Sequence, residues 1–222
     1  MTATESSSVI TGSAITGSAI TSIEFYFDPG CPWTWLTSRW LVDAADQRGI
    51  DVQWRSLSLG VLNAGKEIPE QFRAAMAAGR TAHRVIAALL AADRNDLVGA
   101  FYTEYGLRTF VDGQAPSDAV VRDAAVAAGA EAWADVVDDE SWDDGVAAST
   151  HTAIGLAGPD VGSPILAFGE PRTAIFGPIV SPSPAGADAL RLLDRVLDTA
   201  TIPGFFELKR GRTAGPQFGT RP

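Results

Sequence analysis

A strand, a helix and a second strand follow one another within residues 23–59, and this order constrains the fold more than any other feature. Residues 23–27 are mostly β-branched or aromatic, and Asp28-Pro29-Gly30 ends the run. From residue 32 to 48 apolar residues recur at helical spacing, and Gly49 provides a stop. Residues 50–59 alternate as a second strand. A helix that joins two strands over so short a span predicts a right-handed βαβ unit with parallel strands.

The only cysteine of the chain, Cys31, lies where the first strand ends and the helix begins. Pro32 suits the first helical position, which makes Cys31 the expected N-cap. Unpaired backbone N–H groups and the helix dipole favour a thiolate there, so we expect the thiol pKa to fall below about 8.5. Cys31 is therefore a candidate nucleophile. The alternative is a buried, inert cysteine that packs as a small hydrophobe.

Thr34 stands three residues after Cys31, where a dithiol oxidoreductase carries its second cysteine. With one cysteine in the chain, an intramolecular disulfide is impossible. The Thr34 hydroxyl either donates a hydrogen bond to the Cys31 sulfur or only caps the helix, and the sequence favours neither.

The rest of the chain predicts three further parts. Residues 1–21 are rich in Ser, Thr, Ala and Gly and contain a five-residue repeat, which predicts a disordered arm. An α/β domain begins in residues 22–62, is interrupted by an insertion of four or five helices in residues 63–158, and resumes in residues 159–222. This last part should hold a β-hairpin (163–168 and 173–176), a helix (184–199) and a tail.

Composition limits the classes of partner and ligand. The 222 residues carry a net charge of −10, which argues against nucleic acid and anionic membranes. No apolar stretch approaches the roughly 20 residues of a membrane span, and no signal peptide is evident, so we expect a cytoplasmic protein. The two histidines, His83 and His151, lie at no metal-ligand spacing, so we expect no metal. His83 should be a face residue of an insertion helix.

The order of these elements resembles the thioredoxin fold in its DsbA-like form, an α/β fold with a large α-helical insertion domain. Several motifs are, more narrowly, similar to actinobacterial mycothiol-dependent reductases described as nitroreductases, over roughly residues 23–218. These motifs are Phe-x-Phe-Asp-Pro-x-Cys-Pro-Trp-x-Trp (25–35), Thr-Ser-Arg-Trp (37–40), Leu-Asn (62–63), Pro-Glu-Gln-Phe-Arg (69–73), Asp-Val-Gly-Ser-Pro (160–164), Phe-Gly-Pro (176–178) and Glu-Leu-Lys-Arg (207–210).

The resemblance implies roles for individual residues. Cys31 matches the nucleophile and Thr34 replaces the second cysteine. Ser163-Pro164 matches the cis-proline loop that faces the nucleophile, and only an x-Pro bond reaches the cis isomer at about 0.5–1 kcal/mol. The expected thiol- and substrate-binding positions are Pro32, Trp33, Asn63, Phe72, Gly162, Ser163 and Pro164. Phe72 stands where the family usually has tyrosine. The alternative for Trp33, Asn63 and Phe72 is core packing or loop structure, and for Pro164 the start of an edge strand.

The function implied is that of a monothiol oxidoreductase. A low-molecular-weight thiol, mycothiol or a comparable one, would serve as co-substrate in reducing small disulfide, electrophilic or nitro substrates through the Cys31 thiolate and a mixed disulfide. One alternative is a thiol S-transferase or isomerase that binds the thiol noncovalently. Kappa-class glutathione transferases and related isomerases share the fold, but carry serine at the first motif position. Another is a non-catalytic thioredoxin-like binding or chaperone module. The resemblance leaves a homodimer open.

Overall fold

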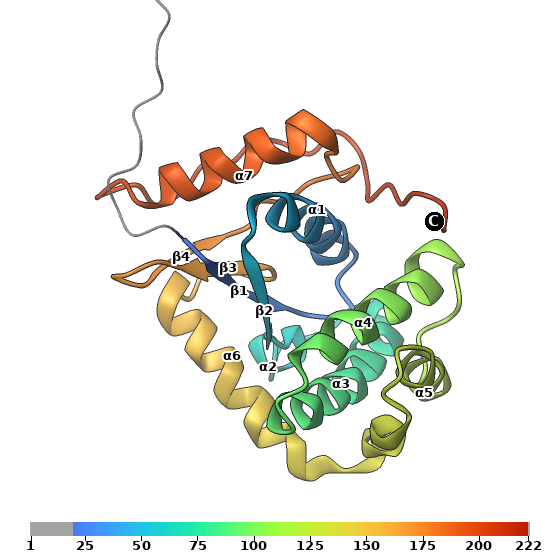
Figure 1. Cartoon of the computed structure of the whole chain (residues 1–222). Helices are drawn as coiled ribbons and strands as arrows, with labels where there is room; N and C mark the ends of the chain where they lie inside the picture. Colours follow the sequence, from blue (N-terminus) through green and yellow to red (C-terminus); the bar gives the residue numbers. More distant parts are fainter. Residues whose placement is uncertain (1–19, 222) are drawn as a thin grey trace, which may run out of the picture.

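The computed structural model describes residues 20–221, so the expected N-terminal arm lies almost entirely outside the described residues. A four-stranded sheet in the order β2-β1-β3-β4 forms its centre (Figure 1). The strands are β1 (Ser22–Phe27), β2 (Asp51–Ser56), β3 (Ile165–Phe168) and β4 (Thr173–Phe176). β1 pairs with β2 in parallel, and β3 is antiparallel to both β1 and β4. The predicted βαβ unit and β-hairpin are confirmed.

The second strand ends earlier than the sequence pattern predicts. Ser58 is the N-cap of a short helix, α2 (Leu59–Leu62), and its Oγ accepts a hydrogen bond from the backbone N–H of Val61 at 3.3 Å. This capping bond turns the chain away from the sheet after Ser56.

Helices cover both faces of the sheet (Figure 1). On one face, α1 (Pro32–Arg48) and α7 (Gly186–Ala200) pack against each other, and Trp40 Nε1 donates to the carbonyl oxygen of Ala189 at 3.0 Å. The other face is covered by α6 (Asp143–Ala157). Gly49 ends α1 with φ 64, a left-handed conformation that explains the glycine.

The insertion is helical, as predicted. Besides α6, it contains α3 (Glu70–Ala91), α4 (Asn95–Gly106), the π-helical η1 (Leu107–Val111), α5 (Asp118–Ala127) and the 3-10 helices η2 (Glu131–Asp138) and η3 (Glu140–Trp142). It shares one hydrophobic core with the sheet, because the ring of Tyr102 on α4 packs on Phe27 of β1 at a centroid distance of 4.2 Å. The domain boundaries drawn from the sequence stay a prediction.

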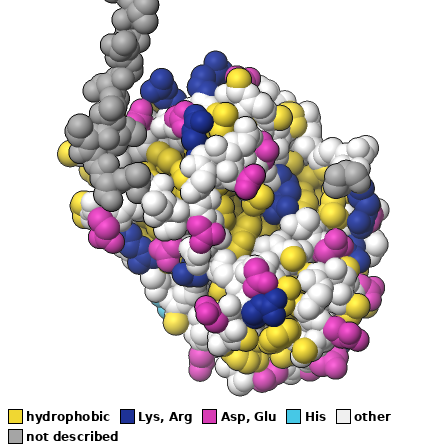
Figure 2. Space-filling model, viewed as in Figure 1, with side chains coloured by type: hydrophobic (Ala, Val, Ile, Leu, Met, Phe, Trp, Pro, Cys, Tyr) yellow, Lys and Arg dark blue, Asp and Glu magenta, His cyan; other side chains and the backbone are white. Residues whose placement is uncertain are grey.

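The surface carries mixed charge. Figure 2 shows acidic and basic side chains interspersed over the visible face rather than gathered in one patch. None of the helices in residues 20–221 is long and apolar enough to cross a membrane.

Candidate active site

Cys31 is the N-cap of α1, as predicted, and is a free, partly exposed thiol. It follows β1 through a turn in which the Cys31 N–H donates to the carbonyl oxygen of Asp28 at 3.1 Å. Pro32 takes the first helical position, and the backbone of Cys31 is extended (φ −90, ψ 113). The strand end and the helix start thus present the sulfur where the first N–H groups of α1 have no helical partner.

The pKa of the Cys31 thiol differs from the sequence prediction. Burial, the largest influence, raises the pKa above its ordinary value, and the Asp28 carboxylate adds to the rise. The side chain and backbone N–H of Thr34 and the N–H of Trp33 act to lower the pKa. The expected fall of the thiol pKa is therefore wrong: the helix start supplies the predicted N–H groups, but the loss of hydration outweighs them.

The Thr34 hydroxyl joins α1 to the loop that precedes β3. Thr34 Oγ1 and Ser163 Oγ are hydrogen-bonded at 2.9 Å, and Ser163 Oγ also accepts the backbone N–H of Asp28 at 2.8 Å. The Ser163–Pro164 peptide bond is cis, which confirms the expected isomer. Thr34 therefore has a contact that neither sequence alternative included, and the cis-proline loop lies against the first turn of α1.

The Asp28 carboxylate stabilises the turn before Cys31 by accepting backbone hydrogen bonds. Its Oδ1 accepts the Gly30 N–H at 2.8 Å and its Oδ2 accepts the Leu59 N–H at 2.7 Å. One carboxylate thus links the Cys31 turn to the start of α2. A Cβ on Gly30 would lie 3.1 Å from the Ala75 carbonyl oxygen, so α3 also packs closely against this turn. The sequence reading took Asp28 only as a turn residue and missed this role.

The C-terminal tail contacts Trp33, and the sequence did not predict this contact. The guanidinium carbon of Arg212 lies 4.4 Å from the centroid of the partly exposed Trp33 ring. Beyond Arg212 the tail is held by a Gln217–Ser181 hydrogen bond, by stacking of Phe218 on Phe110, and by an Arg221–Asp112 ion pair.

The other predicted binding residues are less closely joined to Cys31. Asn63 ends α2, and its Nδ2 donates to the Leu59 carbonyl oxygen at 2.8 Å. Phe72, on the first turn of α3, is 52% exposed. A Cβ on Gly162 would lie 3.9 Å from Leu59 and from the Phe176 ring. The structure groups Cys31, Pro32, Trp33 and Thr34 with Ser163 and Pro164, while the roles of Asn63, Phe72 and Gly162 stay predictions.

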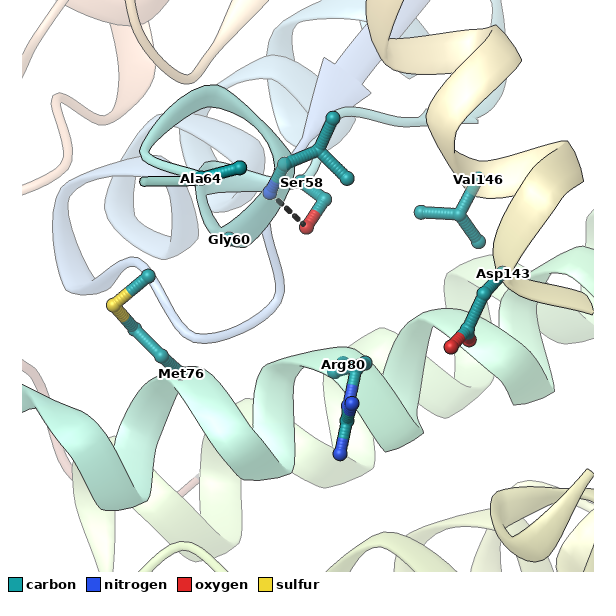
Figure 3. A pocket seen from close by; sticks show the side chains of 8 residues that line it. Ser58, Gly60, Ala64, Met76, Arg80, Asp143 and Val146 are labelled. Carbon is teal, nitrogen blue, oxygen red and sulfur yellow. Dashed lines mark hydrogen bonds between the residues drawn. The ribbon is translucent and has the colours of Figure 1, made fainter. Parts of the chain in front are cut away.

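Cys31 lines neither of two cavities in the described part of the chain. The first, about 290 Å³, opens between α2, α3 and α6 and is lined by Ser58, Gly60, Val61, Ala64, Met76, Arg80, Asp143 and Val146 (Figure 3). The second, about 510 Å³, follows the outer edge of β2 and is bordered by α1 and α4. Met76 in the first cavity is adjacent in sequence to Ala75, which packs on Gly30.

Comparison with known proteins decides the family. The sequence model of the Rv2466c-like family, described as "Mycothiol-dependent nitroreductase Rv2466c", matches residues 30–210. The chain belongs to this family. The uncharacterized protein Rv2286c of Mycobacterium tuberculosis is 32% identical over 198 residues, which cover 87% of this chain and 83% of that protein.

Structures of low sequence identity share the fold. The cytosolic disulfide reductase DsbM from Pseudomonas aeruginosa with GSH superimposes with a TM-score of 0.51 at 17% identity, over 80% of this chain and 99% of that one. A probable DsbA oxidoreductase from Streptomyces coelicolor superimposes with a TM-score of 0.51 at 18% identity. The superposition covers 89% of this chain and 99% of that one. The predicted DsbA-like thioredoxin fold is confirmed, and this Rv2466c-like protein is a thiol-dependent oxidoreductase.

The two histidines of this Rv2466c-like protein occupy different environments. His151 is exposed on α6. His83 is 1% exposed, with Nδ1 3.1 Å from Ser56 Oγ and Nε2 3.7 Å from Asp28 Oδ2. His83 is a face residue of the insertion helix α3, as expected, and that face packs against β2 and the Cys31 turn. Within residues 20–221, no three His, Cys, Asp or Glu side chains gather as metal ligands.

Proposed function

We propose that this protein is a monothiol reductase in which Cys31 attacks small disulfide, electrophilic or nitro substrates and mycothiol completes the cycle. One observation carries the proposal: the only thiol of the chain lies at the start of α1, against the hydrogen-bonded Thr34–Ser163 pair and the cis-proline loop. A second thiol is absent from the sequence, so an external thiol has to resolve any mixed disulfide.

The hydrogen bonds around Thr34 favour its hydroxyl as a hydrogen-bond donor to the Cys31 sulfur. Ser163 Oγ already accepts the Asp28 N–H, and its own proton is free to be donated to Thr34 Oγ1. The Thr34 proton is then available to the Cys31 sulfur, in agreement with the lowering effect of the Thr34 side chain on the thiol pKa. A thiolate gains more from such a donor than a thiol does, because hydrogen bonds to charged acceptors are stronger.

The proposed cycle balances for a disulfide substrate. The Cys31 thiolate attacks one sulfur, the substrate S–S bond breaks, and the other half leaves as a thiolate that takes up a proton. One mycothiol thiolate attacks the Cys31 sulfur of the mixed disulfide, which places mycothiol on Cys31 and expels the second substrate half as a thiolate that takes up a proton. A second mycothiol thiolate then attacks the mycothiol sulfur of this adduct, forms mycothiol disulfide and releases Cys31 as a thiolate. Two electrons pass from two mycothiol molecules to the substrate, and mycothiol disulfide is the product.

The residues proposed to bind the thiol surround Cys31. Pro32 and Trp33 belong to the same turn, and Ser163 and Pro164 form the facing loop, whose backbone would pair with the bound thiol. Gly162, Asn63 and Phe72 would extend this surface toward α2 and α3. A cytoplasmic location, where small thiols are reduced, agrees with the free Cys31 thiol and is part of the proposal.

Mass spectrometry of the intact protein tests the proposal. Incubation with mycothiol disulfide should add one mycothiol to the protein, peptide mapping should place it on Cys31, and excess mycothiol should remove it. The Cys31→Ser variant should gain no mass. Stable conjugates between mycothiol and an electrophile, formed without a Cys31 adduct, would instead identify a transferase. Neither adduct nor conjugate would identify a binding module.

A further inference from the structure

A buried histidine lies beside Asp28, the carboxylate of the Cys31 turn, and one of its ring nitrogens has no hydrogen-bond partner among residues 20–221. His83 comes from α3 and is 1% exposed. Its Nδ1 is hydrogen-bonded to Ser56 Oγ on β2 at 3.1 Å. Its Nε2 is buried and makes no hydrogen bond within the described part of the chain. Buried polar atoms are almost always hydrogen-bonded, so an unpartnered nitrogen at this depth points to a second state in which it has a partner.

The neighbour of that nitrogen is Asp28. Nε2 lies 3.7 Å from Asp28 Oδ2, too far for a hydrogen bond but close enough for an ion pair. A neutral imidazole carries one proton, and when this proton is on Nδ1 toward Ser56, Nε2 is left as a free acceptor facing the carboxylate. Protonation of Nε2 would turn it into a charged donor aimed at Asp28 Oδ2, and a small approach would complete the bond.

Asp28 connects His83 to the thiol. Its carboxylate accepts the N–H of Gly30, the residue before Cys31, and its negative charge raises the pKa of Cys31. The negative charge of this carboxylate destabilises the thiolate form of Cys31. A positive charge on His83 would reduce this destabilisation of the thiolate, because it would lie beside Asp28 in a poorly solvated site.

We propose that His83 is a positioning residue of the thiol chemistry, which takes up one proton at Nε2 when Cys31 ionises and thereby balances the charge of Asp28. The S–H bond of Cys31 breaks and its proton leaves to solvent, His83 gains one proton from solvent as an N–H bond on Nε2, and the imidazolium donates to Asp28 Oδ2. No electrons are transferred. This inference rests on the proposed nucleophilic role of Cys31 and adds the group whose positive charge balances Asp28.

The other titratable groups around this part of α3 are engaged elsewhere or are neutral. Arg84, next to His83, binds Asp143 of α6 and lies 3.3 Å from Glu140 of η3. From α5, Asp118 accepts a hydrogen bond from Thr81. On η2, Asp135 and Asp138 pair with Arg122. From α4, the buried Tyr102 and Tyr105 hydroxyls have raised pKa values, chiefly because of burial. Asp28 is thus the carboxylate that the structure brings to the His83 ring.

Ring ¹⁵N NMR tests the inference without altering His83, because the chain has only two histidines. The His83 ring should stay protonated to higher pH in the wild type than in Cys31→Ser, by about one pH unit, since coupling between the two sites is reciprocal. His151 should titrate identically in both proteins and serves as the internal reference. Equal His83 titration curves in the two proteins would overturn the inference.

Alkylation of Cys31 by iodoacetamide between pH 5 and 10 provides a second test. His83→Gln should react about tenfold more slowly than the wild type at pH 7, with its rate profile displaced by about one unit to higher pH. His151→Gln should match the wild type within about twofold. A His83→Gln variant that folds and keeps the wild-type rate profile would refute the role of His83. If that variant does not fold, the NMR comparison decides.

The outcomes separate this inference from the proposed function. Wild-type protein that forms the mycothiol adduct, but whose His83 and Cys31 titrate independently, would retain the nucleophile and exclude the balancing charge on His83. Wild-type protein that forms no adduct would remove the proposed function, whatever His83 does.

Discussion

Gly106, the last residue of α4, is buried beneath the ring of Trp35, and replacing it with alanine tests the packing that holds α1. A Cβ at Gly106 would lie 2.5 Å or less from three atoms of the Trp35 ring. Trp35 has little room to withdraw, because it is 3% exposed, contacts the Tyr102 ring edge-on at 5.4 Å and has the Arg39 guanidinium 4.3 Å from its centroid.

Two opposing effects, helix propensity and overpacking, set the expected change in the free energy of unfolding. Alanine is favoured over glycine in a helix by about 1 kcal/mol, an upper limit at a helix end. Overpacking a filled core costs about 1–3 kcal/mol, and the upper end applies because three ring atoms would have to move by about an ångström. We expect Gly106→Ala to lower the free energy of unfolding by about 2 kcal/mol, which for a chain of this length shifts Tm by about 4–8 °C.

Urea unfolding followed by tryptophan fluorescence and by far-UV circular dichroism measures this loss. The matched control is Gly155→Ala on α6, where a Cβ meets nothing within 4 Å. That variant should be stabilised by about 0.5–1 kcal/mol. The m-values of both variants should equal that of the wild type. A Gly106→Ala protein as stable as Gly155→Ala would refute the close contact between α4 and Trp35.

Three further outcomes are expected. Thr34→Val, which lacks the hydroxyl that lowers the thiol pKa, should be alkylated about tenfold more slowly at pH 7, and Thr34→Ser should keep the wild-type rate. Arg212→Ala should uncover the Trp33 ring, so acrylamide should quench more of the tryptophan fluorescence while the unfolding midpoint stays unchanged; equal quenching would contradict the contact. Asp143→Asn should destabilise the protein by about 1 kcal/mol at neutral pH, because Asp143 accepts two hydrogen bonds from the buried Arg84. Its pKa is lowered by that pairing, so the difference in unfolding free energy should be complete above about pH 5. It should be lost progressively as the pH falls below the unfolded carboxyl pKa of about 3.9 and through the lowered folded-state pKa.

The predictions that the structure confirmed rest on local rules. Proline after Cys31 fits only the start of a helix, and glycine at position 49 adopts the left-handed conformation that ends one. Alternating apolar residues favour a strand. The parallel β1–β2 pair, the β3–β4 hairpin and the N-cap position of Cys31 could therefore be read from sequence.

The contacts that complete the candidate site join segments that are far apart in the chain. Thr34 and Ser163 are 129 residues apart, and no periodicity specifies which hydroxyls meet over such a separation. No sequence pattern specifies the contact of Arg212 with the Trp33 ring, or that of His83 with Asp28. The sequence placed His83 on a face of an insertion helix, but it did not say which strand and turn that face would contact.

The sequence by itself determined where the nucleophile lies, what begins its helix and which hydroxyl stands in place of a second thiol. Only the tertiary structure decided how that thiol ionises. The helix start supplies local N–H groups that favour a thiolate, but packing around Cys31 removes water from the sulfur, and Asp28 adds a nearby negative charge. Hydration and charge–charge interactions depend on every segment that folds against the group, so their balance is a property of the assembled fold.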